Sequence, residues 1–343
     1  MASKRDAGID MQPDIVALGE PLIEFSADAS GGLVDGARFV AGCGGDTCNF
    51  VVAVSRLGGR AGYIGRIGDD PFAGLLRSRW AQEDVDARHV GIDPSARTGI
   101  YFITRENQAH TFTYYRRDSA ASRITPEDLP EDYIRQARWL HVSGISQAIS
   151  ETAVAAVDKA IAIAREAQTI VSYDPNLRLK LWPLSKARDV IHRTVARVDI
   201  LLPSYEDAVQ LTGSQDPEKI VRTYLAMGPG TVVLKLGAEG ALLGVRSAPK
   251  GDPVLTHVAA CPVEAIDTSG AGDTFDAAFA VSRLSGQPRV ACVRFANAAG
   301  ALVTTGIGTI APIPDRDAVL DLMTRQAPAV QQPLAGEAAR RDP

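Results

Sequence analysis

The chain has 343 residues, of which 45% are hydrophobic, so it can bury a large core. Its formal net charge of −5 argues against a nucleic-acid partner and against an anionic membrane surface. The opening residues lack the apolar segment of a signal peptide, and no run of about 18 apolar residues could span a bilayer. We therefore expect a cytoplasmic enzyme.

Apolar segments typical of strands alternate with segments of helical periodicity along most of the chain. This alternation predicts βαβ units that feed a mostly parallel sheet. Residues 21–40 and 97–117 instead contain strand and turn patterns without helices, which predicts a small antiparallel β lid. We assign residues 14–20, 41–96 and 118–315 to the α/β core. Residues 326–343 are rich in Ala, Pro and polar residues, and we expect them to be disordered.

A glycine-containing turn stands out in DTSGAGDTFDAAFA at 267–280. The strand-like segment PVEAI at 262–266 precedes it, and apolar residues at helical spacing follow it. Small residues permit a tight turn that exposes N–H groups at a helix N-terminus, where anions bind. Asp273 lies beside that anion site. Its carboxylate is suited to accept a proton from the group that attacks the anion.

Two further loops carry candidate substrate residues. AGCGGDTCNF at 41–50 places Asp46 and Asn49 at a second glycine-rich helix start, although an ordinary helix cap would look the same. Arg178 follows the buried-type strand TIVSYD, so it should emerge at the carboxyl edge of the sheet; a surface arginine is the alternative. In YYRRDSAAS at 114–122, strand alternation sends Tyr114 and Arg116 to one face and their neighbours to the other.

Two later segments have two readings each. TVVLKLG carries Lys235 and Gly237, which could line a nucleotide pocket or form a hairpin. FANAAGALVTTG presents a small-residue helix face around Asn297, which could serve close helix packing or make room for an adenine ring.

Together these motifs resemble the PfkB, or ribokinase-like, family of carbohydrate kinases over about residues 14–315. DTSGAGD resembles the ATP-site signature of the family, and GGDTCNFVVAVSRLGGRAGYIGRIGDDPF at 44–72 resembles its amino-terminal signature. Within the family, GEPLIEFS at 19–26, YYRRDSAAS and DPNLRLKLW are similar to 2-keto-3-deoxygluconate kinases. That resemblance implies ATP-dependent phosphorylation of the 6-hydroxyl of a six-carbon keto acid.

The resemblance also implies a ribokinase-like doubly wound fold and a role for each motif residue. An anion hole would comprise Gly270, Ala271 and Gly272, with Asp273 as the catalytic base. Substrate contacts would come from Gly45, Asp46, Asn49, Tyr101, Tyr115, Arg116 and Arg178. ATP contacts would come from Ser204, Lys235, Gly237, Gly270, Gly272 and Asn297, with Mg²⁺ as cofactor.

Two positions depart from the family pattern. Ser204 and Asp207 stand where the family has N-x-x-E, which leaves Asp207 to act on the metal through water. Glu24 stands where many family sugar sites have Asp, and its longer side chain should change which hydroxyls are held. The family's monovalent-cation loop, a K⁺ site, would involve Asp267 and Ser269.

Three alternatives stay open from the sequence. The substrate could be the galactonate epimer of the keto acid, or a neutral sugar in a fructokinase-like enzyme. A non-catalytic family member that acts as a partner protein is the third. We also expect a homo-oligomer, because apolar strands of the lid such as GIYFIT leave an exposed sheet edge.

Overall fold

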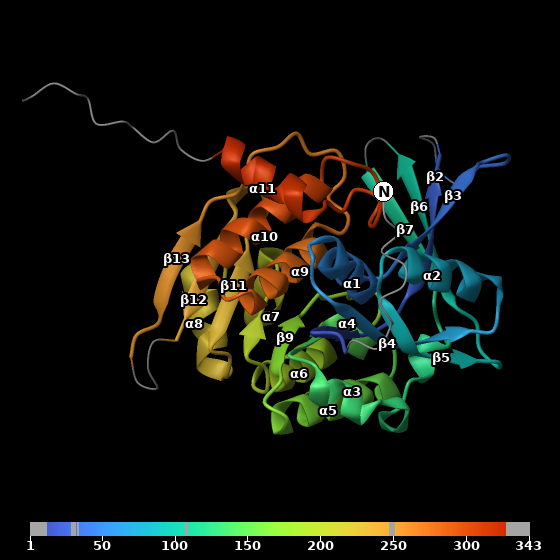
Figure 1. The fold of residues 1–343 in the computed structure, drawn as a ribbon, viewed down its shortest axis with the longest axis horizontal. Coiled ribbons are helices and arrows are strands. Elements are labelled where there is room, and N and C mark those ends of the chain that lie inside the picture. Colours follow the sequence, from blue (N-terminus) through green and yellow to red (C-terminus); the bar gives the residue numbers. More distant parts are fainter. Residues whose placement is uncertain (1–11, 29–31, 33, 107–108, 247–250, 327–343) are drawn as a thin grey trace, which may run out of the picture.

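The computed structural model describes residues 12–28, 32, 34–106, 109–246 and 251–326. Two sheets organise the chain (Figure 1). The main sheet has nine strands in the order β13-β12-β11-β10-β9-β8-β1-β4-β5. Its strands are β1 (Ile15–Leu18), β4 (Ala61–Gly68), β5 (Asp86–Asp93), β8 (Trp139–Ser143), β9 (Ile170–Asp174), β10 (Ile200–Leu201), β11 (Thr231–Lys235), β12 (Ala241–Val245) and β13 (Val254–Val258).

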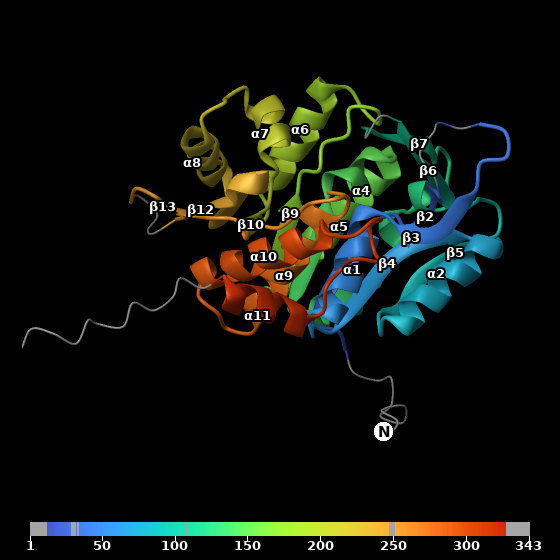
Figure 2. The ribbon, with the colours of Figure 1, turned by 90° about the horizontal axis from the view of Figure 1, so that it is seen from above.

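The main sheet is parallel from β5 to β11 and antiparallel from β11 to β13. Helices cover both of its faces (Figure 2). The predicted doubly wound, mostly parallel fold class is therefore confirmed. The helices are α1 (Asp46–Arg56), α2 (Pro71–Gln82), α3 (Glu131–Gln136), α4 (Gly144–Ala148), α5 (Glu151–Glu166), α6 (Leu184–Val195), α7 (Tyr205–Thr212), α8 (Pro217–Met227), α9 (Ala271–Leu284), α10 (Arg289–Val303) and α11 (Arg316–Arg325).

A hydrophobic core lies on each face of the sheet. One core packs β-strand side chains against α1, α2, α9, α10 and α11, and the other packs them against α3 and α5 to α8. The central strand β1, with the sequence IVAL, is buried along its whole length. Continuous apolar runs of this kind are what a parallel sheet covered on both faces requires.

The lid is a separate four-stranded sheet in the order β3-β2-β6-β7. Its strands are β2 (Leu22–Ala27), β3 (Phe39–Gly44), β6 (Gly99–Glu106) and β7 (Ala109–Tyr115). Strands β2 and β3 pair antiparallel, as do β6 and β7, whereas β2 and β6 pair parallel. The lid thus consists of two antiparallel pairs joined by a parallel one.

Three boundaries differ from the sequence expectations. The lid strand β3 continues to Gly44, past the expected boundary at residue 40. The segment 262–266 joins neither sheet, although α9 begins where the turn predicted a helix. Of the tail expected to be disordered, residues 327–343 lie outside the described residues.

The sheet order changes direction beside β1, because the chain continues to β4 on one side and to β8 on the other. Open α/β sheets bind ligands at the carboxyl ends of the strands at such a point.

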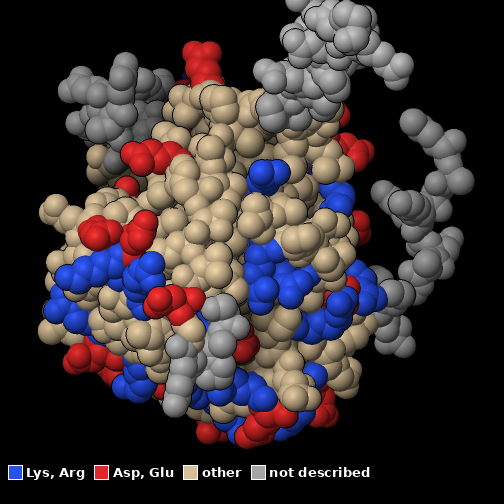
Figure 3. Space-filling model, turned by 90° about the vertical axis from the view of Figure 1, so that its left-hand side faces the viewer, with Lys and Arg blue, Asp and Glu red and all other residues tan. Residues whose placement is uncertain are grey.

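On the face that carries β12 and β13, acidic and basic side chains lie beside one another (Figure 3). No helix in the described part of the chain is long and apolar enough to cross a membrane.

Candidate active site

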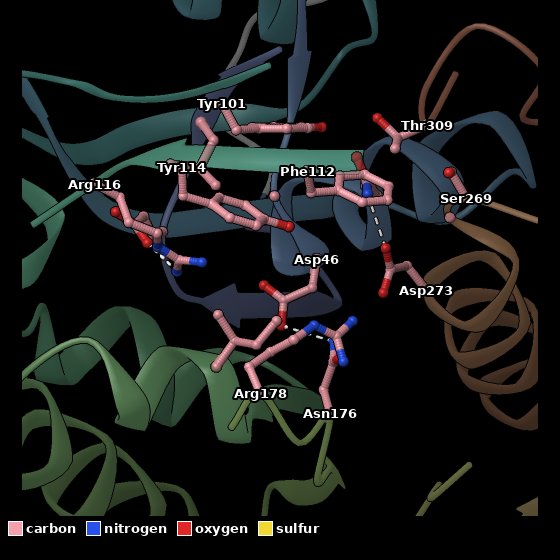
Figure 4. A pocket seen from close by; sticks show the side chains of 16 residues that line it. Asp46, Tyr101, Phe112, Tyr114, Arg116, Asn176, Arg178, Ser269, Asp273 and Thr309 are labelled. Carbon is pink, nitrogen blue, oxygen red and sulfur yellow. Dashed lines mark hydrogen bonds and ion pairs between the residues drawn. The ribbon is translucent and has the colours of Figure 1, made fainter. Parts of the chain in front are cut away.

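A pocket of about 310 Å³ opens between the lid, the N-termini of α1 and α9, and the loop after β9 (Figure 4). Its size suits a small ligand. It is lined by Glu20, Leu22, Gly45, Asp46, Asn49, Tyr101, Phe112, Tyr114, Arg116, Ile145, Asn176, Arg178, Ser269, Gly270, Asp273 and Thr309.

The glycine turn at the start of α9 forms one end of the pocket. Gly270 is left-handed, with φ 76°, and a Cβ there would lie 2.8 Å from the carbonyl oxygen of Thr309. Only glycine fits both constraints without strain. The N–H of Gly272 has no acceptor among the described residues, as expected in the first turn of a helix. The N–H of Ala271 instead donates to Thr268 O at 3.3 Å, so this turn occupies one of the three groups expected in the anion hole.

Asp273 points into the pocket from the first turn of α9. Its Oδ2 accepts a hydrogen bond of 2.8 Å from Asn49 Nδ2 on α1, which fixes the orientation of the carboxylate. Burial raises the pKa of Asp273 to about 7, and the negative charge of Asp46 adds to the shift. A carboxylate with a pKa near neutrality can both accept and release a proton at physiological pH.

Asp46 lies in the first turn of α1, after Gly45, whose φ is 103°. Its Oδ1 accepts from the Thr47 N–H at 2.8 Å, and its Oδ2 accepts from Asn176 Nδ2 at 3.3 Å. Burial raises the pKa of Asp46, although hydrogen bonds oppose this shift. Asp46 therefore presents a held carboxylate to the pocket, and this arrangement suits a hydroxyl-bearing ligand.

Aromatic rings from the lid form the wall above these carboxylates (Figure 4). Tyr101 stacks on Tyr114 with ring centroids 5.4 Å apart, and Phe112 continues the wall. Tyr115 does not belong to it: its side chain is 62% exposed, and its ring packs against Phe102 on the other side of the sheet. The expected substrate contact at Tyr115 is thus replaced by Tyr114, because successive strand residues point to opposite faces.

Two arginines line the pocket, and they differ in whether a carboxylate neutralises their charge. Arg116 is buried and forms an ion pair with Glu20, and its guanidinium lies 5.5 Å from the centroid of the Tyr114 ring. Arg178, from the loop after β9, donates to the carbonyl oxygen of Leu177 at 2.9 Å. No carboxylate within the described ranges forms an ion pair with Arg178. Its positive charge is therefore the one available to a ligand anion.

Lys235 is held beneath the glycine turn. Its ammonium bonds Asp174 at 2.9 Å and Asp276 at 3.0 Å, and it lies 3.5 Å from the position of a Cβ on Gly272. Two buried carboxylates therefore hold Lys235, and its predicted contact with ATP stays a prediction. Its charge lies next to the turn at which an anion is expected.

Other residues expected at the nucleotide site are engaged with the backbone. Asn297 donates to Val258 O and Ala259 O, both at 3.0 Å, and is 8% exposed. Ser204 caps α7 by accepting the N–H of Asp207 at 3.2 Å. Gly237 opens a short 3₁₀ turn after β11 with φ 57°. None of these residues lines the described pocket.

The expected metal and cation residues also have structural partners. Asp207 Oδ2 accepts the N–H of Leu177 at 2.9 Å. Asp267 accepts the N–H groups of Ser269 at 2.9 Å and of Gly308 at 3.0 Å. No group of three or more His, Cys, Asp or Glu residues that could hold a metal ion occurs within the described chain.

Several residues of the lining were not predicted from the sequence. Glu20 and Asn176 each lie two residues after a buried strand, β1 and β9, so their places near strand ends could have identified both. Phe112 and Tyr114 could have been found from strand alternation with Arg116. Thr309 carried no local signal, because a long loop brings it to the site. Glu24 does not line the pocket, which corrects its expected role in holding hydroxyls.

Comparison with known proteins places this site in a family. The model of the pfkB family carbohydrate kinases matches residues 12–316. The chain is 37% identical to 2-dehydro-3-deoxygluconokinase from Thermoproteus tenax, covering 84% of this chain and 87% of that one. It is 36% identical to probable fructokinase-4 from Arabidopsis thaliana, covering 90% and 96%.

A solved structure shows the same architecture. A putative ribokinase II from E. coli in complex with ATP and Mg²⁺ matches with a TM-score of 0.82 and 27% identity, covering 91% of this chain and 99% of that one. The chain belongs to the pfkB family of carbohydrate kinases. It is a phosphotransferase of the sugar kinase class, and its relatives include both a keto-acid kinase and fructokinases at similar identity.

Proposed function

We propose that the protein is a 2-keto-3-deoxygluconate kinase, which transfers the γ-phosphoryl group of ATP to the 6-hydroxyl of that sugar acid and releases ADP. The observation that supports this proposal is the state of Arg178. Its guanidinium lines the pocket, and no described carboxylate forms an ion pair with it. A neutral sugar offers no charge to this group, whereas a 2-keto acid offers a carboxylate for a charge-assisted pair.

The second arginine supports the same assignment by contrast. Arg116 is already neutralised by Glu20, so it contributes shape and hydrogen-bond donors rather than net charge. Of the two arginines expected to contact the substrate, Arg178 is therefore the candidate that binds its carboxylate. The Arg116 to Glu20 pair instead fixes the wall against which the sugar lies, because a buried charge that loses its partner is strongly unfavourable.

In the proposed reaction the oxygen of the 6-hydroxyl attacks the γ-phosphorus of ATP, and Asp273 accepts the proton that this hydroxyl loses. Asn49 orients that carboxylate through its hydrogen bond. The unpaired N–H groups of the glycine turn and the nearby Lys235 ammonium would stabilise the charge on the phosphoryl group. The aromatic lid would exclude water that could otherwise hydrolyse ATP.

The residues fit the expected ions to different degrees. Mg²⁺ is usually held by phosphates, waters and one or two carboxylates, so it does not require the metal-binding acidic cluster that is absent from the described residues. When bound, Mg²⁺ would neutralise charge on the ATP phosphates, and Asp207 would contact it through water. We propose Asp267 and Ser269 for a K⁺ site, supported by the buried Asp267 carboxylate in that loop.

A fructokinase-like activity is the second candidate. Asp46, Asp273 and the hydrogen-bonding Asn176 are suited to sugar hydroxyls, and these groups need no carboxylate on the substrate. A turnover panel separates the two candidates. It comprises 2-keto-3-deoxygluconate, its galactonate epimer, fructose, ribose and adenosine. We expect the highest kcat/KM with a keto acid. A preference for fructose would replace our assignment with the second one, and no turnover on any of the five would favour a non-catalytic partner protein.

We also propose that the protein forms a homodimer through the lid. The sheet face opposite the pocket carries a set of mutually packed aromatic side chains, and the exposed one among them is Tyr115. Pairing with a second copy would cover this face. Sedimentation should give twice the chain mass, and Tyr115→Glu should give the chain mass. A wild-type monomer at micromolar concentration would refute the assembly.

A further inference from the structure

Glu24 on β2 has an unexpected place in the fold. It is 6% exposed and absent from the pocket lining, so its carboxylate has no access to a ligand there. Its Oε2 accepts hydrogen bonds from Tyr101 Oη at 2.5 Å and from Thr309 Oγ1 at 3.0 Å. Its Oε1 accepts from Ser26 Oγ at 2.9 Å. Three hydroxyls thus donate to one buried acid, and two of them belong to residues that line the pocket, Tyr101 and Thr309.

These donors come from two different parts of the molecule. Ser26 lies on β2 with Glu24, and Tyr101 lies opposite Glu24 in the pairing of β2 with β6. Thr309 belongs to the loop after α10, which is distant in the sequence and outside the lid. The bond from Thr309 therefore joins the lid sheet to this loop, whereas the bond from Ser26 stays within one strand.

The loop of Thr309 packs directly on the glycine turn. The carbonyl oxygen of Thr309 lies 2.8 Å from the Cβ position of Gly270. One residue earlier, the N–H of Gly308 donates to Asp267, whose other carboxylate oxygen accepts the N–H of Ser269. A shift of Thr309 would consequently displace the backbone that presents N–H groups to an anion.

At the other end, Tyr101 forms part of the aromatic wall. Its ring stacks on that of Tyr114, and both rings line the pocket. A continuous series of contacts therefore runs from the pocket wall through the Tyr101 hydroxyl, the Glu24 carboxylate and Thr309 to Gly270. The links are two hydrogen bonds, of 2.5 and 3.0 Å, and one close backbone contact among buried groups, and networks of this kind can couple two sites.

We infer that Glu24 is a positioning residue that couples the sugar side of the pocket to the glycine turn, so that sugar binding raises the affinity for nucleotide. This inference rests on the proposed function in one respect, since it takes the pocket as the sugar site and the turn as the phosphate site. It does not depend on which sugar is bound. Coupling of this kind is reciprocal, and its usual size is about 5- to 150-fold in affinity.

The test measures binding of a non-hydrolysable ATP analogue by calorimetry, with and without a saturating amount of whichever sugar the wild type phosphorylates best. Thr309→Val keeps the side-chain shape and removes the bond that joins the loop to Glu24, together with a longer one of 3.5 Å from the same hydroxyl to the carbonyl oxygen of Cys43. Ser26→Ala is the matched control, because it also removes one hydrogen bond to Glu24 but leaves the bridge intact.

We expect the sugar to raise analogue affinity at least about fivefold in the wild type and in Ser26→Ala. This ratio of affinities with and without sugar should fall close to one in Thr309→Val and in Tyr101→Phe, and the double variant should show no smaller ratio than either single variant. An unchanged ratio in Thr309→Val would overturn the inference. An equal fall of the ratio in Ser26→Ala would also overturn it.

Hydrogen exchange keeps the inference testable if Thr309→Val does not fold. Because Thr309 itself lines the pocket, the comparison is with Tyr101→Phe. Sugar should increase protection of residues 304–310 in the wild type and in Ser26→Ala but less in Tyr101→Phe, and an equal increase in Tyr101→Phe would count against coupling. If the wild type phosphorylates no sugar, the proposed kinase function is wrong, but the inference about Glu24 can still be tested by hydrogen exchange without ligand. Thr309→Val should then exchange faster than Ser26→Ala in both β6 and residues 304–310. Equal exchange in the two variants would refute the inference.

Discussion

The glycine turn at residues 267–273 and the aromatic lid border the same pocket, yet they are built in opposite ways. The turn is contiguous in sequence, and the anion site proposed there consists of its backbone N–H groups. The lid contributes side chains from three strands, which line the pocket together with Glu20 after β1 and with residues of the loop after β9. The turn is therefore defined by local conformation and the lid wall by packing.

We infer from this difference that the turn serves the chemical step and that the lid and Arg178 serve substrate selection. Phosphoryl transfer requires positioned donors and one base, and a short helix start provides both. Substrate choice depends on which charges stay unpaired in the assembled pocket, as Arg116 and Arg178 illustrate. Changes in the turn should consequently reduce turnover of every substrate, whereas changes at the lid and at Arg178 should discriminate between substrates.

The largest effect should follow from Asp273→Asn. The amide cannot accept the proton, so kcat should fall by at least about 100-fold for acidic and neutral sugars alike. Nucleotide affinity should be nearly unchanged, because the turn and the Asn49 contact can persist. Asp321→Asn, an exposed change on α11, is the control and should keep wild-type kcat. Near-normal turnover of folded Asp273→Asn, measured in a coupled ADP assay, would remove Asp273 from the role of base.

Arg178→Met should give the next largest effect, and it should be selective. A guanidinium paired with a carboxylate contributes roughly 1.5–3 kcal/mol, so kcat/KM for the keto acid should fall about 10- to 100-fold. Use of fructose should change little, and Arg178→Lys should restore only part of the loss because the planar fork is missing. An equal fall on both substrates would mean that Arg178 does not recognise the acid.

The pH profile should show a smaller effect that is common to all substrates. The buried Asp273 has a pKa raised to about 7, and a base must be ionised to act. The value of kcat/KM should therefore be constant above pH 7 and fall as the pH drops through 7, approaching tenfold per pH unit. A profile that stays flat down to pH 5 would show either that the carboxylate is ionised throughout or that another group is the base.

The smallest effects should distinguish the two glycines of the turn by stability. Gly270→Ala should lower the free energy of unfolding by about 1–3 kcal/mol, because its φ is 76° and the new Cβ would meet Thr309 O. A Cβ on Gly272 would make only an ordinary contact, at 3.5 Å from Lys235 Nζ. Gly272→Ala should leave stability unchanged or raise it by up to about 1 kcal/mol. Urea titration measures both, and equal losses would refute the assignment of strain to Gly270.

Local patterns were sufficient to predict the fold class and the helix start after the glycine turn. Alternating strand and helix patterns specify βαβ units, because each element must bury one face against the next. The run DTSGAGD contains the positive-φ glycine, the helix start and Asp273 within seven residues, so its conformation depends little on distant parts of the chain.

Only the tertiary structure decided which groups stay available in the pocket. The sequence predicted ligand contacts for Lys235 and Arg116 but did not show their ion pairs with Asp174, Asp276 and Glu20, which are distant along the chain. Likewise, the contact between Glu24 and Thr309 joins residues from opposite ends of the protein. Charge pairing and burial depend on long-range packing, and the spacing of residues in a sequence contains no record of which distant partner fills a site.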